Sequence, residues 1–264
     1  MEQLIRKIIP AKILKQVRLL FQLPKLIAHK GNTYQCPICG YKSKDWYLIG
    51  CNVEVYQKWQ IIGDGLRKAG CYKCHSTDKE RLLFLYLQEF FKQNIINDLK
   101  ILHFAPERGV YEFLSKLPGV EYITADLYPA GYQYFAKEIK TMDILNIPLA
   151  DNFADLIICS HILEYIPDDI SAMKELYRVL KPGAHAVLQV PISPVLEKTI
   201  EDFSITGAEE RIVAFGQSDH VRIYGQDYFD RLESAGFKIT KINNFEHKEF
   251  FGLNPEESIF LVTK

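Results

Sequence analysis

The stretch ADLIICSHILEYI, residues 154–166, begins as an apolar run and ends in a cluster of polar side chains. An apolar run of this length is typical of a strand buried on both faces of a sheet. A helix is predicted over residues 168–180, and it stops at the Lys181-Pro182-Gly183 signal. Strand and helix signals alternate on both sides of this stretch, which predicts an α/β sheet. We expect strands at 101–105, 121–127, 137–141, 185–190, 237–242 and 258–262, and helices at 110–116 and 226–235.

Two blocks resemble a known family. Residues 143–166, DILNIPLADNFADLIICSHILEYI, read like its block D…LPF.D.SFD.I…H.LEHI, and residues 175–183, ELYRVLKPG, read like its E..RVLKPGG. From about Leu99 onward the chain therefore resembles the class I S-adenosylmethionine-dependent methyltransferases of the type 11 kind. The resemblance implies a doubly wound, Rossmann-like sheet of seven strands with an antiparallel last strand. It also implies S-adenosylmethionine as the cofactor.

The resemblance assigns cofactor positions along the chain. Asp126 corresponds to the carboxylate that accepts hydrogen bonds from both ribose hydroxyls, which requires an ionised bidentate acceptor. Asp143 corresponds to the residue that receives the adenine amino group. The other positions are Leu127 beside Asp126, Met142 and Ile144 flanking the adenine, and Ser160 and His161 near the sulfonium.

The first loop departs from the family. Relatives end the first strand with an acid and a glycine-rich turn, whereas this chain has His103-Phe-Ala-Pro-Glu-Arg-Gly109. His103 stands in place of the acid, Ala105 and Glu107 replace glycines, and Gly109 leaves room for the backbone. Two interpretations stay open: Glu107 faces the methionine ammonium of the cofactor, or the site is degenerate and holds nothing.

Two histidines are candidate general bases for a hydroxyl acceptor. His161 follows the central strand, and His220 lies where this family builds its acceptor site. Asp219 or Glu164 is expected to orient one of them. Arg222 and Tyr224 either bind an anionic or sugar-like acceptor or anchor the loop.

Four cysteines form two CxxC pairs, Cys36-Pro-Ile-Cys39 and Cys71-Tyr-Lys-Cys74. Each pair can place two thiolates on one metal ion, so the pairs together predict a tetrahedral, structural Zn²⁺ site with no open position. Gly40 and Gly70 would supply the permissive backbone of the turns. The alternatives are a c-type haem attachment at Cys71-Tyr-Lys-Cys74-His75 or four unpaired cysteines, with Cys51 and His75 as spare ligands. The whole chain resembles a bacterial subgroup with such a module and a GQ.DHVR.YG segment, here residues 216–225.

The N-terminal residues carry basic and apolar side chains on opposite sides of a predicted helix. Residues 1–24 are therefore expected either to lie on an anionic membrane surface or to pack against protein. The net charge of −1 provides no general attraction for nucleic acid. The chain has no apolar run of about 18 residues and no secretion signal, so we expect a cytoplasmic protein, peripheral to the inner face of the membrane if the first interpretation holds.

Four segments follow from these patterns: a basic amphipathic segment (1–31), a zinc-ribbon-like module (32–76), a connecting helix (77–98) with a Thr77–Glu80 capping box, and a methyltransferase domain (99–264). The predicted function is methyl transfer to a hydroxyl or amine of a small molecule, glycan or lipid-linked intermediate. One alternative is an RNA or protein methyltransferase that uses the zinc module as a reader. Another is a non-catalytic zinc-containing interaction protein on a degenerate scaffold.

Overall fold

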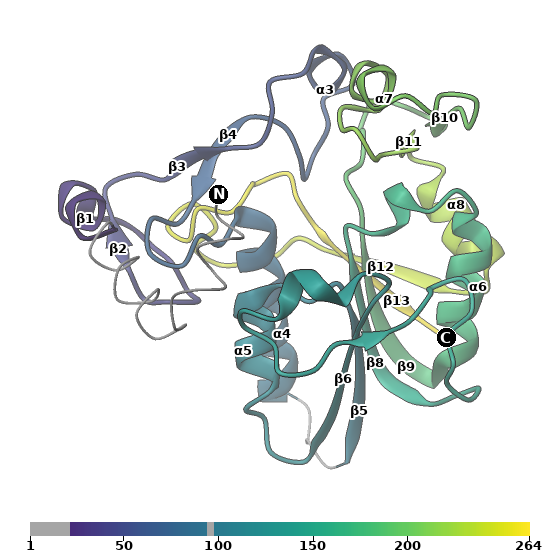
Figure 1. Cartoon of the computed structure of the whole chain (residues 1–264). Helices are drawn as coiled ribbons and strands as arrows, with labels where there is room; N and C mark the ends of the chain where they lie inside the picture. The colour runs from purple at the N-terminus through teal and green to yellow at the C-terminus, as the bar shows by residue number, and fades with distance from the viewer. Residues whose placement is uncertain (1–21, 94–97) are drawn as a thin grey trace.

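The computed structural model describes residues 22–93 and 98–264, and its centre is a seven-stranded sheet (Figure 1). The strand order is β12-β13-β9-β8-β5-β6-β7. Strands β5 to β9 run parallel, whereas β13 is antiparallel to both of its neighbours, β9 and β12. The predicted doubly wound sheet with an antiparallel last strand is therefore confirmed. The strands are β5 Leu99–Phe104, β6 Val120–Asp126, β7 Lys140–Thr141, β8 Ala154–Ser160, β9 Leu180–Gln189, β12 Lys238–Ile242 and β13 Ile259–Thr263.

Two predicted elements differ from the observed ones. Strand β9 begins at Leu180, directly after α6, because Leu180 already pairs with Ala154 of β8. The expected turn at 181–183 is thus part of the strand. The stretch between β9 and the last helix was expected to be irregular, but it contains three short elements, which are β10 Ile200–Glu201, α7 Ala208–Phe215 and β11 Arg222–Ile223.

Helices cover both faces of the sheet, with α4 and α5 on one side and α6 and α8 on the other (Figure 1). Successive side chains of a strand point to opposite faces. In β8, Leu156 and Ile158 pack with α4 and α5, while Ile157 and Cys159 pack with α6 and α8. The helices are α4 Asp78–Gln93, α5 Arg108–Leu114, α6 Asp169–Val179 and α8 Tyr228–Ser234, with short 3₁₀ turns at Pro129–Tyr132 and Leu163–Tyr165.

Helix α4 starts with the predicted capping box. The Thr77 backbone N–H donates to Glu80 Oε2 at 2.8 Å, and the Glu80 backbone N–H donates to Thr77 Oγ1 at 3.4 Å. Leu83 and Leu87 are buried in the same core as Val110 of α5. The helix therefore covers the sheet as well as joining the two parts of the chain.

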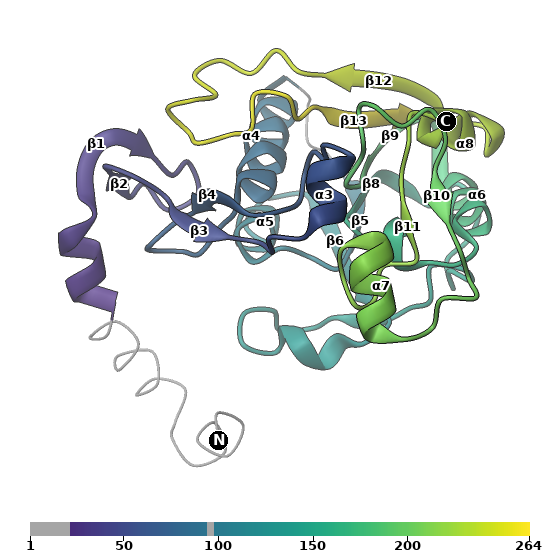
Figure 2. The same cartoon turned by 90° about the horizontal axis from the view of Figure 1, so that it is seen from above.

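The N-terminal module lies over one edge of the sheet (Figure 2). It consists of two antiparallel pairs and a short helix, and CxxC pairs follow β1 and β4. Its elements are β1 Lys30–Gln35, β2 Lys42–Ser43, β3 Tyr47–Ile49, α3 Glu54–Lys58 and β4 Arg67–Gly70. Residues 22–28 are helical, and Ile27 is 73% exposed. The predicted membrane contact of residues 1–24 lies almost entirely outside the described residues. Among those that are described, no helix is long and apolar enough to cross a bilayer.

The buried guanidinium of Arg81 joins this module to the rest of the chain. It donates to the carbonyls of Ala69 and Ser76 in the module, at 2.9 and 3.0 Å. It also donates to the carbonyls of Phe251 and Gly252, between β12 and β13, at 2.8 and 2.7 Å. Its planar face lies 4.0 Å from the ring of Trp46. One side chain thus satisfies four carbonyls of two segments that are far apart in sequence.

We expect Arg81→Ala to lower the free energy of unfolding by at least about 2 kcal/mol, because it leaves buried carbonyls without a donor. Urea denaturation measures the change. Arg108→Ala is the matched control, since the Arg108–Glu112 pair is half exposed and should contribute less than about 1 kcal/mol. Equal small effects of both substitutions would contradict the role of Arg81.

Candidate functional site

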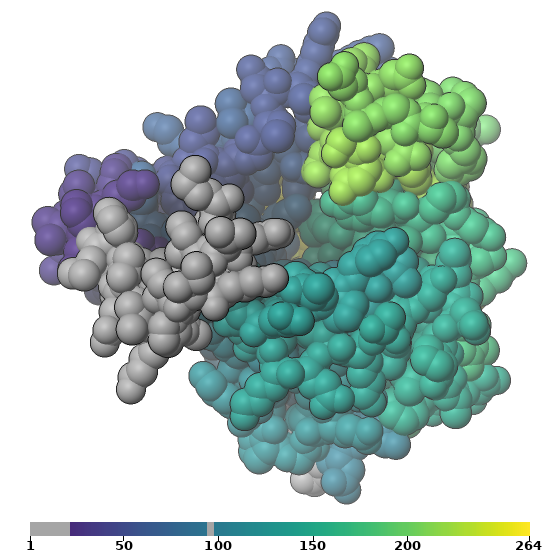
Figure 3. Space-filling model, in the orientation of Figure 1, coloured from purple at the N-terminus to yellow at the C-terminus, as the bar shows by residue number. Residues whose placement is uncertain are grey.

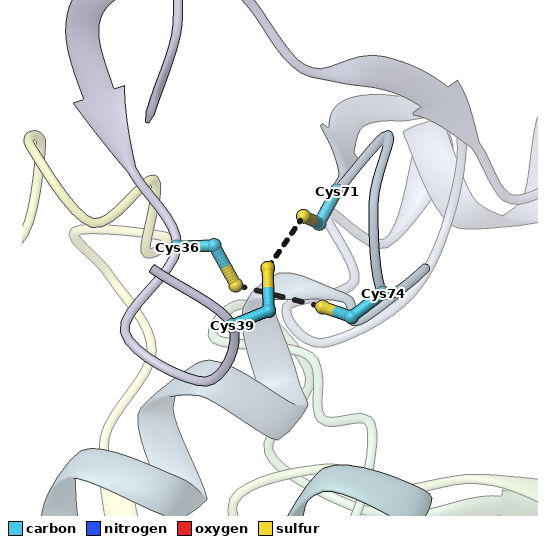
Figure 4. Close-up of side chains that lie close together, drawn as sticks. All are labelled: Cys36, Cys39, Cys71 and Cys74. Carbon is cyan, nitrogen blue, oxygen red and sulfur yellow. Dashed lines mark hydrogen bonds between the residues drawn. The ribbon is translucent and has the colours of Figure 1, made fainter. Parts of the chain in front are cut away.

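The four cysteines of the CxxC pairs converge (Figure 4). Their Sγ atoms all lie within 4.8 Å of one another, and Cys36–Cys74 and Cys39–Cys71 are each 3.6 Å apart. A tetrahedral ion with bonds of about 2.3 Å holds its sulfurs about 3.8 Å apart. The cysteines therefore fit a Zn²⁺ ion, and Cys51 lies exposed and outside this group.

The two CxxC turns have the same backbone hydrogen bonds. In the first turn, the Gly40 N–H donates to Cys36 O and the Cys36 N–H to Tyr41 O; in the second, His75 donates to Cys71 O and Cys71 to Ser76 O. Gly40 and His75 both have a positive φ, of 68° and 64°. In the second turn, His75 therefore occupies the position that Gly40 occupies in the first. Gly70, which we expected to serve the second turn, instead makes room for the Tyr47 ring, since a Cβ there would lie 2.2 Å from it.

Arg81 also supports the thiolate form of the cysteines. Its charge lies close enough to interact with Cys36, Cys71 and Cys74. Four thiolates around one Zn²⁺ carry a net charge of about −2, so a neighbouring cation offsets part of it. Convergence of both pairs also favours a four-cysteine centre over a haem attached at Cys71 and Cys74 alone.

Asp126 ends β6 at the carboxyl edge of the sheet, where ligands bind in doubly wound folds. Its Oδ1 accepts the Tyr128 N–H at 2.6 Å, and its Oδ2 accepts the Tyr132 hydroxyl at 2.6 Å. Each carboxylate oxygen has two lone pairs, so each can accept one more hydrogen bond. This residue therefore fits the predicted ribose contact.

The loop 103–109, which departs from the family pattern, has a carboxylate at Glu107 in place of the missing acid at 103. His103 is fully buried, and its ring nitrogens lie 3.0 Å from Glu107 Oε2 and 2.8 Å from the Tyr122 hydroxyl. Ala105 has a φ of 46°, a left-handed conformation that glycine adopts more readily. The backbone of a glycine turn is thus kept without the glycine, and the carboxylate stands at 107 instead of 103.

Gly109 meets the zinc module. A Cβ at Gly109 would lie 2.8 Å from Ile38 Cγ2, and Ile38 is the residue between Pro37 and Cys39 in the first CxxC turn. The missing side chain at Gly109 therefore makes room for Ile38. From the sequence we expected it to make room for the backbone to approach the cofactor. Both segments lie at the start of α5.

The predicted adenine positions follow β7. Met142 and Ile144 are buried, whereas Asp143 is exposed, with Oδ1 accepting the Leu145 N–H at 2.9 Å. Leu127, after Asp126, is 45% exposed. Of these residues, the exposed Asp143 and Leu127 are available to a ligand.

Past the carboxyl ends of β8 and β9 lies a group of buried polar atoms without hydrogen-bond partners in the described chain. His161, with a φ of 55°, follows Ser160, which is also buried. The unpartnered atoms are both ring nitrogens of His161, Oε2 of Glu164, Nε2 of His220 and Oε2 of Glu257. Buried polar atoms normally have partners, so this group is the natural place for a polar ligand.

The charges of this group are set by burial. Desolvation lowers the pKa of His161 well below its usual value, so its imidazole is neutral. It raises the pKa of Glu164 to about 8 and that of Glu257 to about 7. His161 Nδ1 lies 3.5 Å from Glu164 Oε1. The ring of His220 stacks edge-on against Tyr165, and burial lowers the pKa of His220 as well.

Arg222 and Tyr224 anchor the loop in this structure. Arg222 has no exposed surface and donates to the carbonyls of residues 163, 166 and 167 and to Glu201. Tyr224 is also fully buried, and its hydroxyl donates to Asp169 at 2.8 Å. Asp219 is exposed beside His220. The anchoring interpretation thus fits Arg222 and Tyr224 better than a contact with the acceptor.

A cavity of about 10 Å³, which has room for a single water molecule, lies between this group and the zinc module. Tyr56 and Ile61 of the module line it together with Glu164 and His220. Sequence reasoning missed Tyr56, Glu257 and the nearby Asp64. Only Asp64 had a local signal, because it stands between two glycines.

Comparison with known proteins finds similarity to methyltransferases over part of the chain. Residues 110–188 match a family described as a methyltransferase domain. A demethylmenaquinone methyltransferase of Staphylococcus epidermidis is 41% identical over 54 residues, which are 20% of this chain and 22% of the relative, so the match spans about a fifth of its length.

Two solved methyltransferases match the structure at low sequence identity. An S-adenosylmethionine-dependent enzyme from Archaeoglobus fulgidus is 15% identical, with 73% of this chain and 96% of that chain covered and a TM-score of 0.46. One from Mesorhizobium loti is 15% identical, with 67% of this chain and 94% of that chain covered and a TM-score of 0.46.

We expect about one Zn²⁺ per chain in protein purified without chelator, and loss of that zinc in Cys36→Ala. Elemental analysis of the purified protein measures it. Cys51→Ala is the control, because Cys51 is exposed and outside the cluster, and it should keep its zinc. Less than about half a zinc per wild-type chain would refute the four-cysteine site.

Stability should depend on pH through Glu164. Its folded pKa of about 8 lies above the ordinary value of 4.5, so its contribution to stability is complete below the ordinary value and is lost as pH rises through about 8. The free energy of unfolding of Glu164→Gln, relative to that of the wild type, should therefore be higher at about pH 9 than at about pH 5.5. The expected increase is on the order of a few kcal/mol. Denaturation at both pH values measures this. A constant difference would mean that Glu164 ionises normally.

Proposed function

We propose that this chain, which carries a methyltransferase domain over residues 110–188, transfers the methyl group of S-adenosylmethionine to a hydroxyl or amine acceptor. The acceptor is a small molecule, a glycan or a lipid-linked intermediate. The observation that carries the proposal is the group of buried, unpartnered polar atoms on His161, Glu164, His220 and Glu257. This group lies where a doubly wound sheet binds its ligands.

The cofactor would be held along the carboxyl edge of the sheet. Asp126 would accept from the ribose hydroxyls, and Asp143 would receive the adenine amino group. Glu107, held by His103 and 18% exposed, would face the methionine ammonium. When bound, S-adenosylmethionine supplies an electrophilic methyl group for an in-line displacement, so the protein acts mainly by positioning.

His161 would remove the proton from the acceptor. Its imidazole is neutral, and both of its nitrogens are without partners in the described chain, so Nε2 can accept a proton. Once His161 is protonated, a positive charge stands 3.5 Å from Glu164. The Glu164 carboxyl oxygen that faces this charge stabilises the imidazolium, and the proton taken from the acceptor stays on His161. Glu164 thus acts through His161, as a positioning residue.

The charges around the cavity favour an uncharged acceptor. Arg222, the cation in its lining, already uses its donors on carbonyls and on Glu201. Lys79 interacts electrostatically with His161 and Glu164, Arg67 also acts on His161, and Asp64 opposes Lys79 at Glu164. The near-neutral net charge of the chain also argues against an RNA acceptor.

Binding of S-adenosylhomocysteine tests the proposal and separates it from a non-catalytic scaffold. Calorimetry should show binding by the wild type and a loss of at least about tenfold in Asp126→Ala, because a charge-assisted contact is removed. Asp230→Ala changes an exposed acid of α8 and should bind as the wild type does. A wild type that does not respond would end the enzyme proposal.

His161→Ala should separate binding from chemistry. It should keep its affinity for S-adenosylhomocysteine but lose about 100-fold or more of the transfer of labelled methyl from S-adenosylmethionine into an extract of the source cells. Unchanged transfer by this variant would remove His161 from the mechanism while leaving the cofactor site intact.

A further inference from the structure

The segment between the two CxxC pairs reaches the candidate acceptor site. Ile62 and Ile192 exchange backbone hydrogen bonds of 2.9 and 3.1 Å, and the Ser193 hydroxyl donates to Trp59 O at 2.6 Å. Ile192 and Ser193 lie just beyond β9, after Val190 and Pro191. Residues 59–62 are therefore fixed to the edge of the sheet by backbone pairing.

The next residues of this segment cover His161. Gly63 has a φ of 89°, and a Cβ there would lie 3.3 Å from His161 Cε1 and 3.4 Å from Glu257 Oε1. The left-handed conformation favours glycine, and an added Cβ would be tight against His161. The backbone at Gly63 thus lies directly against two members of the buried polar group.

Asp64 connects this turn to the segment that carries His220. Its Oδ2 accepts from the Tyr56 hydroxyl at 3.2 Å and from the Gln217 side-chain amide, and its Oδ1 accepts the Gly65 N–H at 2.8 Å. Gln217 lies three residues before His220, just after α7, and α3 lies beside α7 in both ribbon views (Figures 1 and 2). The space-filling view shows the α3 and α7 regions next to each other at the surface (Figure 3).

We propose that the Gly63-Asp64-Gly65 turn of the zinc module forms a wall of the acceptor site, with Asp64 as the positioning residue that sets the place of His220. The inference rests on the proposed function and extends it, because it makes the zinc module a part of the active site. The acceptor would present its uncharged hydroxyl or amine to the small cavity that Tyr56, Glu164 and His220 line beside this turn.

The metal centre holds the wall in place. Strand β4 runs from the turn directly to Cys71, and Arg67 in β4 donates to Gly65 O at 2.9 Å. Arg67 also forms two hydrogen bonds of 2.6 and 2.7 Å with Asp78, the first residue of α4. The first CxxC turn, through Ile38, covers Gly109 on the cofactor side. One module therefore contacts both halves of the site.

The charges that act on His220 make Asp64 testable without a known acceptor. Burial lowers the pKa of His220, the negative charges of Asp64 and Asp219 raise it, and the charge of Lys79 lowers it. A hydrogen bond to the Phe215 backbone also raises it. Asp64→Asn keeps the size of the side chain and removes the charge, so the pKa of His220 should fall.

The experiment compares full-length wild type with Asp64→Asn, using Asp45→Asn as a control in the same module, where Asp45 pairs with His29. Three properties should not change in Asp64→Asn: zinc content, S-adenosylhomocysteine affinity and melting temperature within a few degrees. Transfer of labelled methyl into the cell extract should fall at least about tenfold. The His220 signal, in ¹³C-histidine-labelled protein and assigned with His220→Gln, should titrate at lower pH.

The outcomes separate the two proposals. If Asp64→Asn changes neither methyl transfer nor the titration of His220, the proposal that this turn forms a wall of the acceptor site is wrong. Failure of the wild type to bind S-adenosylhomocysteine would overturn the proposed function, and the His220 titration would still show whether Asp64 acts on His220. Gly63→Ala is a second variant, in case Asp64→Asn folds poorly. Its added methyl group should shift the NMR signal of His161, which lies against Gly63, and leave the signal of His29 unchanged.

Discussion

One buried cation, Arg81, joins the N-terminal module to the rest of the chain. A guanidinium presents five donors in a fixed plane, and here four carbonyls of two distant segments use them. Its desolvation is offset by these bonds, by the Trp46 ring and by the nearby thiolates. The module therefore docks in one orientation. In that orientation Ile38 meets Gly109, and Gly63 meets His161.

In that orientation the N-terminal module packs against the loop 103–109 through Ile38 and Gly109. The loop 103–109 keeps its left-handed turn at Ala105 and moves its carboxylate to Glu107. Ile38 then covers the same loop from outside. The cysteine cluster, this loop and the buried histidines therefore contact one another through Ile38 and Gly63.

Patterns local in sequence were sufficient for the fold. Apolar runs located β5, β6 and β8, the Thr77–Glu80 spacing marked the start of α4, and the CxxC spacing brought together the four cysteines. The site was less predictable because it is built from distant segments. Arg222 and Tyr224 have the chemistry of substrate-binding residues, yet nearby carbonyls and Asp169 occupy their donors. Nothing near Glu257 in the sequence indicates that it lies against Gly63.

The bonds from Arg81 to Phe251 and Gly252 span 170 and 171 residues. A chain is synthesised from its N-terminus, so the cysteines leave the ribosome long before these carbonyls exist. Until then the module lacks its docking surface, and its thiols are open to oxidation or to a wrong metal. Early capture of zinc would protect them. Because the cysteines are synthesised first, zinc would have to be available while the rest of the chain is still being made.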